Sequence, residues 1–350
     1  MGEIEVLHIP CNVPYIQKLH EPGCIKIVNT FNTPSFAWLN KQARNSMWFS
    51  TFDVCHIHFG FEFEPIEVVQ TALDLLKERG KPIVFTIHEL SSVHGVTGEV
   101  YQQYMAMICD YATSYITLSE GAKHEFQDVY GTNLPVSVTP HGRVSICSHE
   151  GGRLRSKKTV LMYGSLRKNR NILTTFINVA LASADKWNLR WITKPFTDMQ
   201  LQDPALQVVI KLHDGSSASI ETTLPMSDSE MVQMVAGADV LVLPYLEAGH
   251  SGQLELAFDC GTPVVSAKVG FLYDQTKFWP EKFRSNVNFV DWSDGKRWLY
   301  QQRIVSAVRQ VVNADRHDRM ILERIIFRES EHKKIIRAHR RIYEEALSKT

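Results

Sequence analysis

The feature that most limits how this chain can fold is a repeated alternation of short β-branched apolar runs with amphipathic helical stretches. Strands of a parallel sheet are buried on both faces and are joined by helices, so this alternation is typical of βαβ units. The strands expected in the first half are Val6–Ile9, Val54–His58, Ile83–Ile87 and Tyr115–Leu118. The sequence therefore predicts an α/β fold.

Helical spacing and end signals place the connecting helices. Apolar residues recur at helical spacing over Ile66–Arg79, and Gly80 supplies a left-handed stop. A second helix is expected over about Glu99–Ala112, and a third begins after Ser119, which is a good N-cap residue. The first half thus contains a complete set of strand and helix signals.

The same alternation resumes in the second half. Ser227 and Glu230 form a capping box that predicts a helix start. The stretch from Ile304 to Leu347 is charged and helical. The other expected elements are a helix over Ile172–Ala184 and strands over Thr159–Tyr163, Leu189–Thr193, Val208–Leu212, Val240–Leu243 and Val264–Ser266.

A polar, glycine-rich segment around Ser148–Lys158 separates the two halves and predicts a domain boundary. A chain of 350 residues exceeds the usual size of one domain. We expect an N-terminal domain over 1–150 and a second over 151–325. The remaining helix, 326–350, is expected to pack back on the N-terminal domain.

Charge and composition exclude several classes of protein. Lys plus Arg and Asp plus Glu are both 38, so no overall field favours nucleic acid. The N-terminus lacks the pattern of a signal peptide, and no run approaches 18 apolar residues, so we expect a cytoplasmic chain without a transmembrane segment. The oligomeric state is left open.

The six cysteines are scattered and are expected to be reduced thiols. Cys55, His56 and His58 raise the alternative of a metal site. Alternation along a strand sends the two histidines to one face and Cys55 to the other, which favours a structural role. No metal is expected.

Two segments of the second half carry the signals of an anion site. In the first, Tyr163-Gly164-Ser165-Leu166-Arg167-Lys168-Asn169-Arg170, a strand ends and a helix follows, with glycine for close backbone approach. The planar guanidinium groups of Arg167 and Arg170 can each donate two hydrogen bonds to phosphate oxygens. In the second, Leu243-Pro244-Tyr245 leads to Ser251 and Gly252, which open a helix, with Glu255 about one turn in. Each segment is weak evidence alone, because solvated basic turns and helix starts are common.

In this order the two segments, followed by Gly261-Thr262-Pro263-Val264-Val265, resemble the donor half of retaining glycosyltransferases of family four, in the subgroup with Ser-Gly in this loop. The resemblance extends to the strand ends at His56-Ile57-His58, Thr86-Ile87-His88 and Pro140-His141-Gly142. It implies the GT-B fold, with two Rossmann-like domains whose parallel sheets face each other across a cleft.

The resemblance also implies a set of donor-binding residues. Gly164, Ser165, Arg167, Arg170, Ser251 and Gly252 would bind the diphosphate, and Pro225 and Met226 would face the nucleobase, although core packing explains these two equally well. Glu247 and Glu255 would contact the donor. Their separation matches the family's paired glutamates, yet counting back from Gly261 puts Leu256 where the second glutamate falls, which places the ribose contact of Glu255 in doubt.

For the N-terminal half, the resemblance places His88 beside the transferred sugar as the catalytic candidate. Asn12, His58 and Glu62 are candidates for contacting the acceptor. Asn12 lies in Pro10-Cys11-Asn12, where the family has a Gly-Gly pair. Acidic residues in such loops are usually only solvated.

The expected function is transfer of a hexose-type sugar from a nucleotide-diphosphate sugar to a hydroxyl acceptor, with retention and without metal or cofactor. The acceptor can be a glycan, a polyol or a secondary metabolite. A sugar-nucleotide epimerase and a non-catalytic sugar-nucleotide binding subunit remain as alternatives. A dinucleotide oxidoreductase is disfavoured, because neither half has Gly-x-Gly-x-x-Gly after its first strand.

Overall fold

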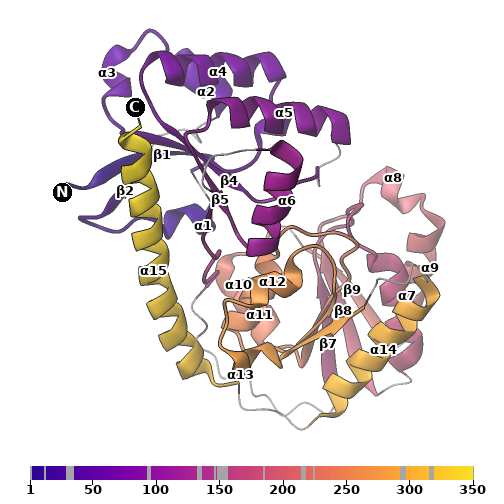
Figure 1. Ribbon diagram of the computed structural model, residues 1–350. Coiled ribbons are helices and arrows are strands. Elements are labelled where there is room, and N and C mark those ends of the chain that lie inside the picture. The colour runs from indigo at the N-terminus through magenta and orange to yellow at the C-terminus, as the bar shows by residue number, and fades with distance from the viewer. Residues whose placement is uncertain are drawn as a thin grey trace. The chain divides into compact units, whose positions relative to one another are not determined.

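A computed structural model describes residues 2–11, 13–28, 35–92, 96–131, 136–145, 147, 157–183, 186–213, 218–223, 225–291, 297–314 and 319–349. The chain forms two compact units. Unit 1 comprises Met1–Gly142 with Glu329–Thr350, and unit 2 comprises Arg143–Arg328. Each unit is built on one six-stranded sheet of parallel neighbours flanked by helices (Figure 1). The expected α/β fold with two parallel sheets is confirmed.

The sheet of unit 1 has the order β2-β1-β3-β4-β5-β6. Its strands are β1 (Ile4–Ile9), β2 (Ile25–Ile27), β3 (Val54–Ile57), β4 (Ile83–Ile87), β5 (Ser114–Thr117) and β6 (Val136–Val138). Its helices before Gly142 are α1 (Pro14–Gln17), α2 (Phe36–Lys41), α3 (Ser46–Phe49), the 3-10 turn η1 (Phe61–Phe63), α4 (Ile66–Glu78), α5 (Gly98–Tyr111) and α6 (Glu120–Tyr130). The strand order reverses between β1 and β3, and ligands of such sheets bind at the carboxyl ends of the strands beside this reversal.

Local sequence signals explain the helices of unit 1. Helix α4 buries Val69, Leu73 and Leu76 on one face, as the helical spacing predicts. Ser119 is the N-cap of α6, as expected, and its side chain accepts a hydrogen bond from the backbone N–H of Ala122. These apolar faces fill the core on one side of the sheet.

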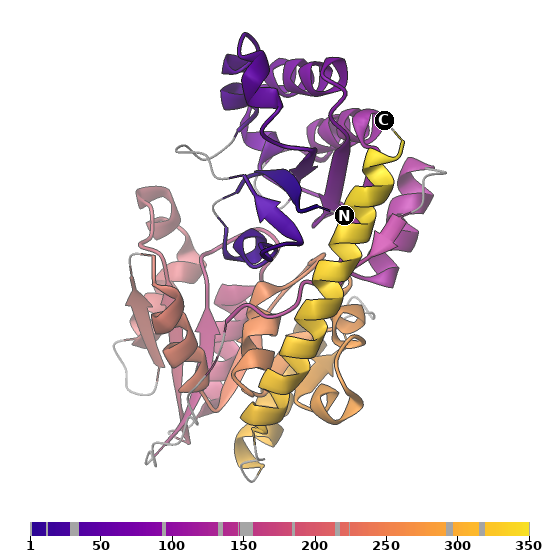
Figure 2. The same ribbon diagram turned by 90° about the vertical axis from the view of Figure 1, so that its left-hand side faces the viewer.

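Helix α15 (Ile321–Leu347) covers the opposite face of this sheet over part of its length. Ile335, Ile336 and Tyr343 of α15 are buried in one cluster with Val6 of β1 and Val54 of β3. Figure 2 shows α15 as one continuous helix, drawn in yellow. The helix therefore contributes its first residues to unit 2 and the rest to unit 1.

The sheet of unit 2 has the order β12-β11-β10-β7-β8-β9. Its strands are β7 (Lys158–Tyr163), β8 (Trp187–Thr193), β9 (Ala218–Thr222), β10 (Val240–Leu243), β11 (Val264–Ala267) and β12 (Val287–Val290). Its helices before α15 are α7 (Ile172–Ser183), α8 (Asp198–Leu201), α9 (Pro204–His213), α10 (Asp228–Ala236), α11 (Gly252–Asp259), α12 (Leu272–Thr276), α13 (Glu281–Arg284) and α14 (Arg297–Asn313). The strand order is that of a Rossmann fold, with its reversal between β7 and β10.

The strand expected at Val208–Leu212 is wrong, because these residues lie inside helix α9. A short apolar run fits a buried strand or a helix equally well, and here the burial decides. Leu206 and Val209 are buried while Val208 is exposed, which is the spacing of a helix. Strand β9 instead follows at Ala218–Thr222.

One arginine pairs with two buried carboxylates in the core of unit 2. Arg328, at the point where α15 leaves this unit, pairs with Glu255 and Asp259, which lie one turn apart on α11. The Arg328 Nε–Asp259 Oδ1 distance is 2.7 Å, and the guanidinium also lies over the ring of Phe258. Burial alone would raise the pKa of Glu255, but Arg328 and His250 lower it to about 2. Burial raises the pKa of Asp259 against the opposing effect of Arg328.

We predict that Arg328→Ala destabilises unit 2 by about 3–5 kcal/mol, because it leaves two carboxylates buried without their cation. Chemical denaturation followed by tryptophan fluorescence measures this loss. Arg341→Ala is the matched control, since its pair with Glu345 on the same helix is exposed and should change the free energy of unfolding by under about 0.5 kcal/mol. Equal effects of the two substitutions would contradict the prediction.

Across the described residues, helices long enough to cross a bilayer lack the apolar stretch that crossing needs. The six cysteines are all free thiols, as expected.

Candidate active site

The loops after β7 and β10 are joined at the point where the strand order of unit 2 reverses. The backbones of Arg170 and Tyr245 form an antiparallel bridge. The N–H of Asn171 donates to the carbonyl of Pro244 at 2.7 Å, and the N–H of Leu246 donates to the carbonyl of Asn169 at 2.8 Å. The two segments that the sequence singles out therefore converge at one sheet edge.

Side chains extend this junction. The Arg170 guanidinium lies over the ring of Tyr245 and donates to its hydroxyl at 3.1 Å. The same hydroxyl lies 3.1 Å from the Ser251 Oγ. Tyr245 thus links the arginine after β7 to the residue that caps helix α11.

Gly164 permits the close packing of Arg170. Its φ is +116°, a conformation that side-chain-bearing residues rarely adopt. A Cβ at this position would lie 2.1 Å from Arg170 Nη1. Glycine is therefore needed both for the turn of the backbone and for the space that the guanidinium occupies.

A cavity of about 290 Å³, here the donor cavity, opens beside this junction. Six expected donor-binding residues line it: Gly164, Ser165, Arg167, Arg170, Pro225 and Met226. The remaining lining residues are Tyr163, Ile192, Thr193, Lys194, Thr223, Met231 and Gln253. The cavity thus combines three cations with apolar side chains and holds no carboxylate among these lining residues.

Lys194 and Gln253 are cavity residues that the sequence analysis missed. Lys194 follows β8, which pairs with β7, so the Rossmann strand order could have located it. Gln253 bridges the two loops, because its Nε2 donates to the carbonyl of Tyr163 at 2.9 Å. No local signal marks this glutamine.

The other expected donor residues lie outside the lining of this cavity. Ser251 is buried, its Oγ accepts from the N–H of Leu254, and its own N–H donates to Gln275. Gly252, the first residue of α11, is exposed, as is Glu247. Glu255 is buried, and its carboxylate contacts Arg328, His250 and Gln275.

A second cavity in unit 2, of about 310 Å³, lies at the opposite edge of the sheet beside Lys158, Asp239 and Arg319. Strands begin rather than end here, and ligands of such sheets bind at the carboxyl ends. The Arg319 guanidinium donates to the carbonyls of Ala236 and Ala238, so it acts as a structural brace. We place the candidate site at the donor cavity.

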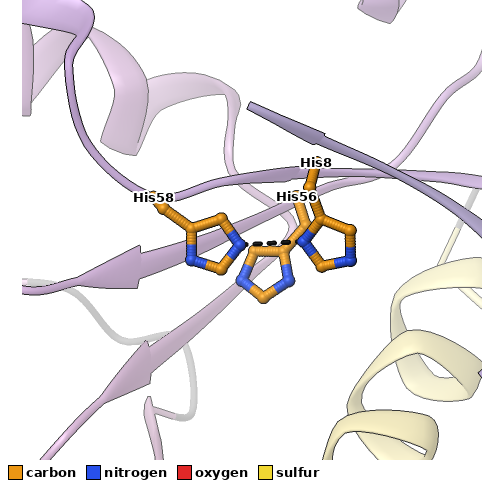
Figure 3. A group of neighbouring side chains, drawn as sticks. All are labelled: His8, His56 and His58. Atoms are coloured by element: carbon orange, nitrogen blue, oxygen red, sulfur yellow. Dashed lines mark hydrogen bonds between the residues drawn. The ribbon is translucent and has the colours of Figure 1, made fainter. Parts of the chain in front are cut away.

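In unit 1, the strand reversal gathers five histidines: His8, His56, His58, His88 and His339, here the histidine cluster. The first four lie on or directly after β1, β3 and β4, and His339 comes from α15. Figure 3 shows His8, His56 and His58 turned toward one another. His56 and His58 share a face, as the strand alternation predicts, with a ring separation of 4.0 Å. The sequence analysis missed His8 and His339.

Hydrogen bonds account for the arrangement of this cluster. His8, His56 and His58 offer ring nitrogens within 4.8 Å of one another, the spacing that a metal would need. Both nitrogens of His56 are already bonded, Nδ1 to the Tyr343 hydroxyl and Nε2 to Thr86 Oγ1, each at 2.7 Å. A metal ligand would have to give up one of these bonds, so the geometry favours a structural network.

The network reaches His88, the expected catalytic residue. His8 Nδ1 lies 2.9 Å from His58 Nε2, and His58 Nδ1 lies 3.4 Å from His88 Nε2. His8 Nε2 is buried without a partner, and an unpaired acceptor costs less than an unpaired N–H. We therefore assign the protons to Nδ1 of His8 and His58, so that His58 donates to Nε2 of His88.

The expected acceptor residues occupy different environments. His58 is buried within the cluster, and Glu62, in the turn η1, accepts from the N–H of Gly60. Asn12 lies outside the described residues. His88 is only partly buried and follows β4 directly.

Burial keeps four members of the cluster, His8, His56, His58 and His339, neutral near pH 7. It lowers the pKa of His8 to about 3, with a further contribution from His339, and lowers that of His339 to about 4. Burial and neighbouring histidines also hold the pKa values of His56 and His58 well below their usual range. The unfolded chain therefore binds protons at a higher pH than the folded unit does.

We predict that unit 1 loses stability as the pH falls below about 6.5, by roughly 1 kcal/mol per buried histidine at pH 5.5. The loss continues until the pH reaches the lowered folded-state values, about 4 for His339 and about 3 for His8. Thermal denaturation at several pH values measures it. His339→Leu should flatten the dependence, whereas His124→Leu, on the exposed face of α6, should leave it unchanged. A dependence unaltered by His339→Leu would contradict the assignment.

Comparison with known proteins supports the fold independently. No protein-family model matches the chain, and no curated protein matches it by sequence. A solved glycosyltransferase from Rickettsia africae is 10% identical with a TM-score of 0.65, and the match covers 100% of both chains. Anabaena HepE, solved with UDP and glucose, is 10% identical with a TM-score of 0.64, covering 96% of this chain and 98% of that one. Each of these two matches covers at least 96% of this chain and of the neighbour.

A third neighbour is larger than this chain. The pneumococcal O-GlcNAc transferase GtfA, solved with UDP and GlcNAc, is 12% identical with a TM-score of 0.63. The match covers 87% of this chain but 59% of GtfA. These neighbours and the two parallel sheets show that the chain has the GT-B fold.

Proposed function

We propose that this chain is a glycosyltransferase that takes a sugar from a nucleotide diphosphate. The observation that carries the proposal is the donor cavity, in which Arg167, Arg170 and Lys194 meet an apolar wall formed by Met226 and Met231. A diphosphate requires the cations, and a nucleobase packs against the apolar side chains. The UDP and sugars bound by HepE and GtfA support a UDP-sugar as the first donor to test.

The proposed reaction proceeds with retention at the anomeric carbon, as the resemblance to family four implies. The bond from that carbon to the diphosphate oxygen breaks, the bond to the acceptor oxygen forms, and the acceptor proton passes to the departing diphosphate. The protein supplies position and positive charge. Arg167, Arg170 and the first turn of α11 stabilise the charge that develops on the leaving group.

His88 is proposed to contact the transferred sugar, with His58 as a positioning residue. With Nε2 accepting from His58, His88 carries its proton on Nδ1, and we propose that this ring faces a sugar hydroxyl in the bound complex. A glycan, a polyol or a secondary metabolite remains the proposed acceptor.

We predict that Arg167→Ala weakens nucleotide-diphosphate binding about 10- to 100-fold, because hydrogen bonds to charged groups contribute about 1.5–3 kcal/mol. Arg167 is exposed, so the fold should survive the change. Titration calorimetry with UDP, GDP, dTDP and ADP gives the affinities. Lys168→Ala removes the neighbouring exposed cation, which does not line the cavity, and should leave binding intact. Failure of all four nucleotides to bind the wild type would refute the proposed donor.

We also predict that sugar transfer persists in excess chelator, because the lining cations replace the charge that a metal would supply. Nucleotide release from the donor is measured with and without EDTA. Activity lost in EDTA and restored by magnesium would require another mechanism. Product analysis distinguishes transfer from epimerisation, which leaves no glycosylated acceptor.

A further inference from the structure

A separate cavity of about 410 Å³ lies in unit 2. Helices α7 and α14, which carry most of its lining residues, pack against each other and lie side by side in Figure 1. It is lined by Asn171, Thr174, Asn178, Leu246, Trp298, Gln301 and Gln302. None of these residues lines the donor cavity, so the two sites can be occupied independently. We call this region the amide groove.

The strongest sign of a ligand in the amide groove is Gln301. Its side chain is only 5% exposed, yet neither its Oε1 nor its Nε2 has a hydrogen-bond partner. A buried amide left unpaired costs about 1–3 kcal/mol for each unsatisfied group. A ligand that both accepts and donates hydrogen bonds would satisfy both atoms.

Helical geometry places the other groups around Gln301. Trp298, Gln301 and Gln302 are spaced i, i+3 and i+4 on α14, so they share one face. Thr174 and Asn178 are spaced i and i+4 on α7 and face the same groove. The Asn178 Nδ2 donates to the carbonyl of Thr174 at 2.8 Å, which leaves its carbonyl oxygen as an acceptor.

Trp298 adds an apolar platform to these amides. It is 62% exposed, and it is the one exposed tryptophan in the part of the chain that the structure describes. Indole rings offer a large flat surface for a ligand at a low cost in conformational entropy. The apolar face of a pyranose ring fits such a surface.

We propose that the amide groove is a second carbohydrate-binding site, which takes a neutral oligosaccharide. Carboxamides and a hydroxyl can both donate to and accept from sugar hydroxyl groups, whereas the described lining holds no charged side chain to attract a phosphate or an amine. The volume suits a ligand of more than one sugar ring. This proposal does not depend on the identity of the nucleotide donor.

Backbone hydrogen bonds connect residues that line the amide groove to the two loops beside the donor cavity. Leu246 lines the groove, and its N–H donates to the carbonyl of Asn169 in the loop after β7. Asn171, also in the lining, donates to the carbonyl of Pro244. A bound oligosaccharide would therefore rest against the backbone that also forms the donor cavity.

The test is titration of the full chain with a panel of neutral oligosaccharides: maltotriose, cellotriose, mannotriose, chitotriose and galactobiose. At least one should bind with a dissociation constant below about 10 mM and shift the emission of Trp298, identified by its loss in Trp298→Phe. Binding should persist with UDP present. If no sugar binds, or if binding leaves the Trp298 emission unchanged, the proposal fails.

Matched variants identify the groove. Gln301→Leu should weaken binding at least 10-fold, whereas Gln310→Leu makes the same change at an exposed position of α14 and should have no effect. Trp298→Ala should abolish binding, while Met199→Ala removes another exposed apolar side chain and should not. The melting temperature of each variant shows whether unit 2 remains folded. Equal affinities for Gln301→Leu and Gln310→Leu in folded proteins would refute the site.

Discussion

The donor cavity depends on the contact between Arg170 and Tyr245. Two loops that follow different strands must be held together before their side chains can act on one ligand. The backbone bridge and the guanidinium over the tyrosine ring provide this, and Gly164 makes room for them. The cluster of cations beside this junction thus begins with a packing constraint, because a side chain at position 164 would occupy the place of the Arg170 guanidinium.

The two units deal with buried polar groups in opposite ways. In unit 2, the carboxylates of Glu255 and Asp259 share one guanidinium, that of Arg328, in buried ion pairs. In unit 1, the buried histidines His8, His56, His58 and His339 stay uncharged. The ring nitrogens of His56 and His58 bond to neighbouring rings and hydroxyls. The stability of the ion pairs in unit 2 depends on Arg328, which is distant in the sequence. The stability of the neutral histidines in unit 1 depends on the pH.

The sequence predicts those features of the fold and of the candidate site that depend on a single strand–loop–helix unit. The central strands and the capped helices follow from apolar periodicity, and Gly164, Arg167 and Arg170 reach the cavity because they directly follow a strand. Lys194 and Gln253 depend on which strands become neighbours, which periodicity does not encode. The contact between Glu255 and Arg328 joins residues far apart in the chain, and so the buried position of Glu255 has no local signal. The helix at Val208–Leu212 was missed because a short apolar run fits two structures.

Helix α15 makes unit 1 discontinuous in the chain. Its sheet needs Ile335, Ile336 and Tyr343 to cover one face, and these residues follow all of unit 2. During synthesis the ribosome delivers the strands of unit 1 first and their covering helix only after Arg143–Arg328 has emerged. The apolar residues and imidazoles of that sheet face therefore stay uncovered until the ribosome has translated the whole of the second unit.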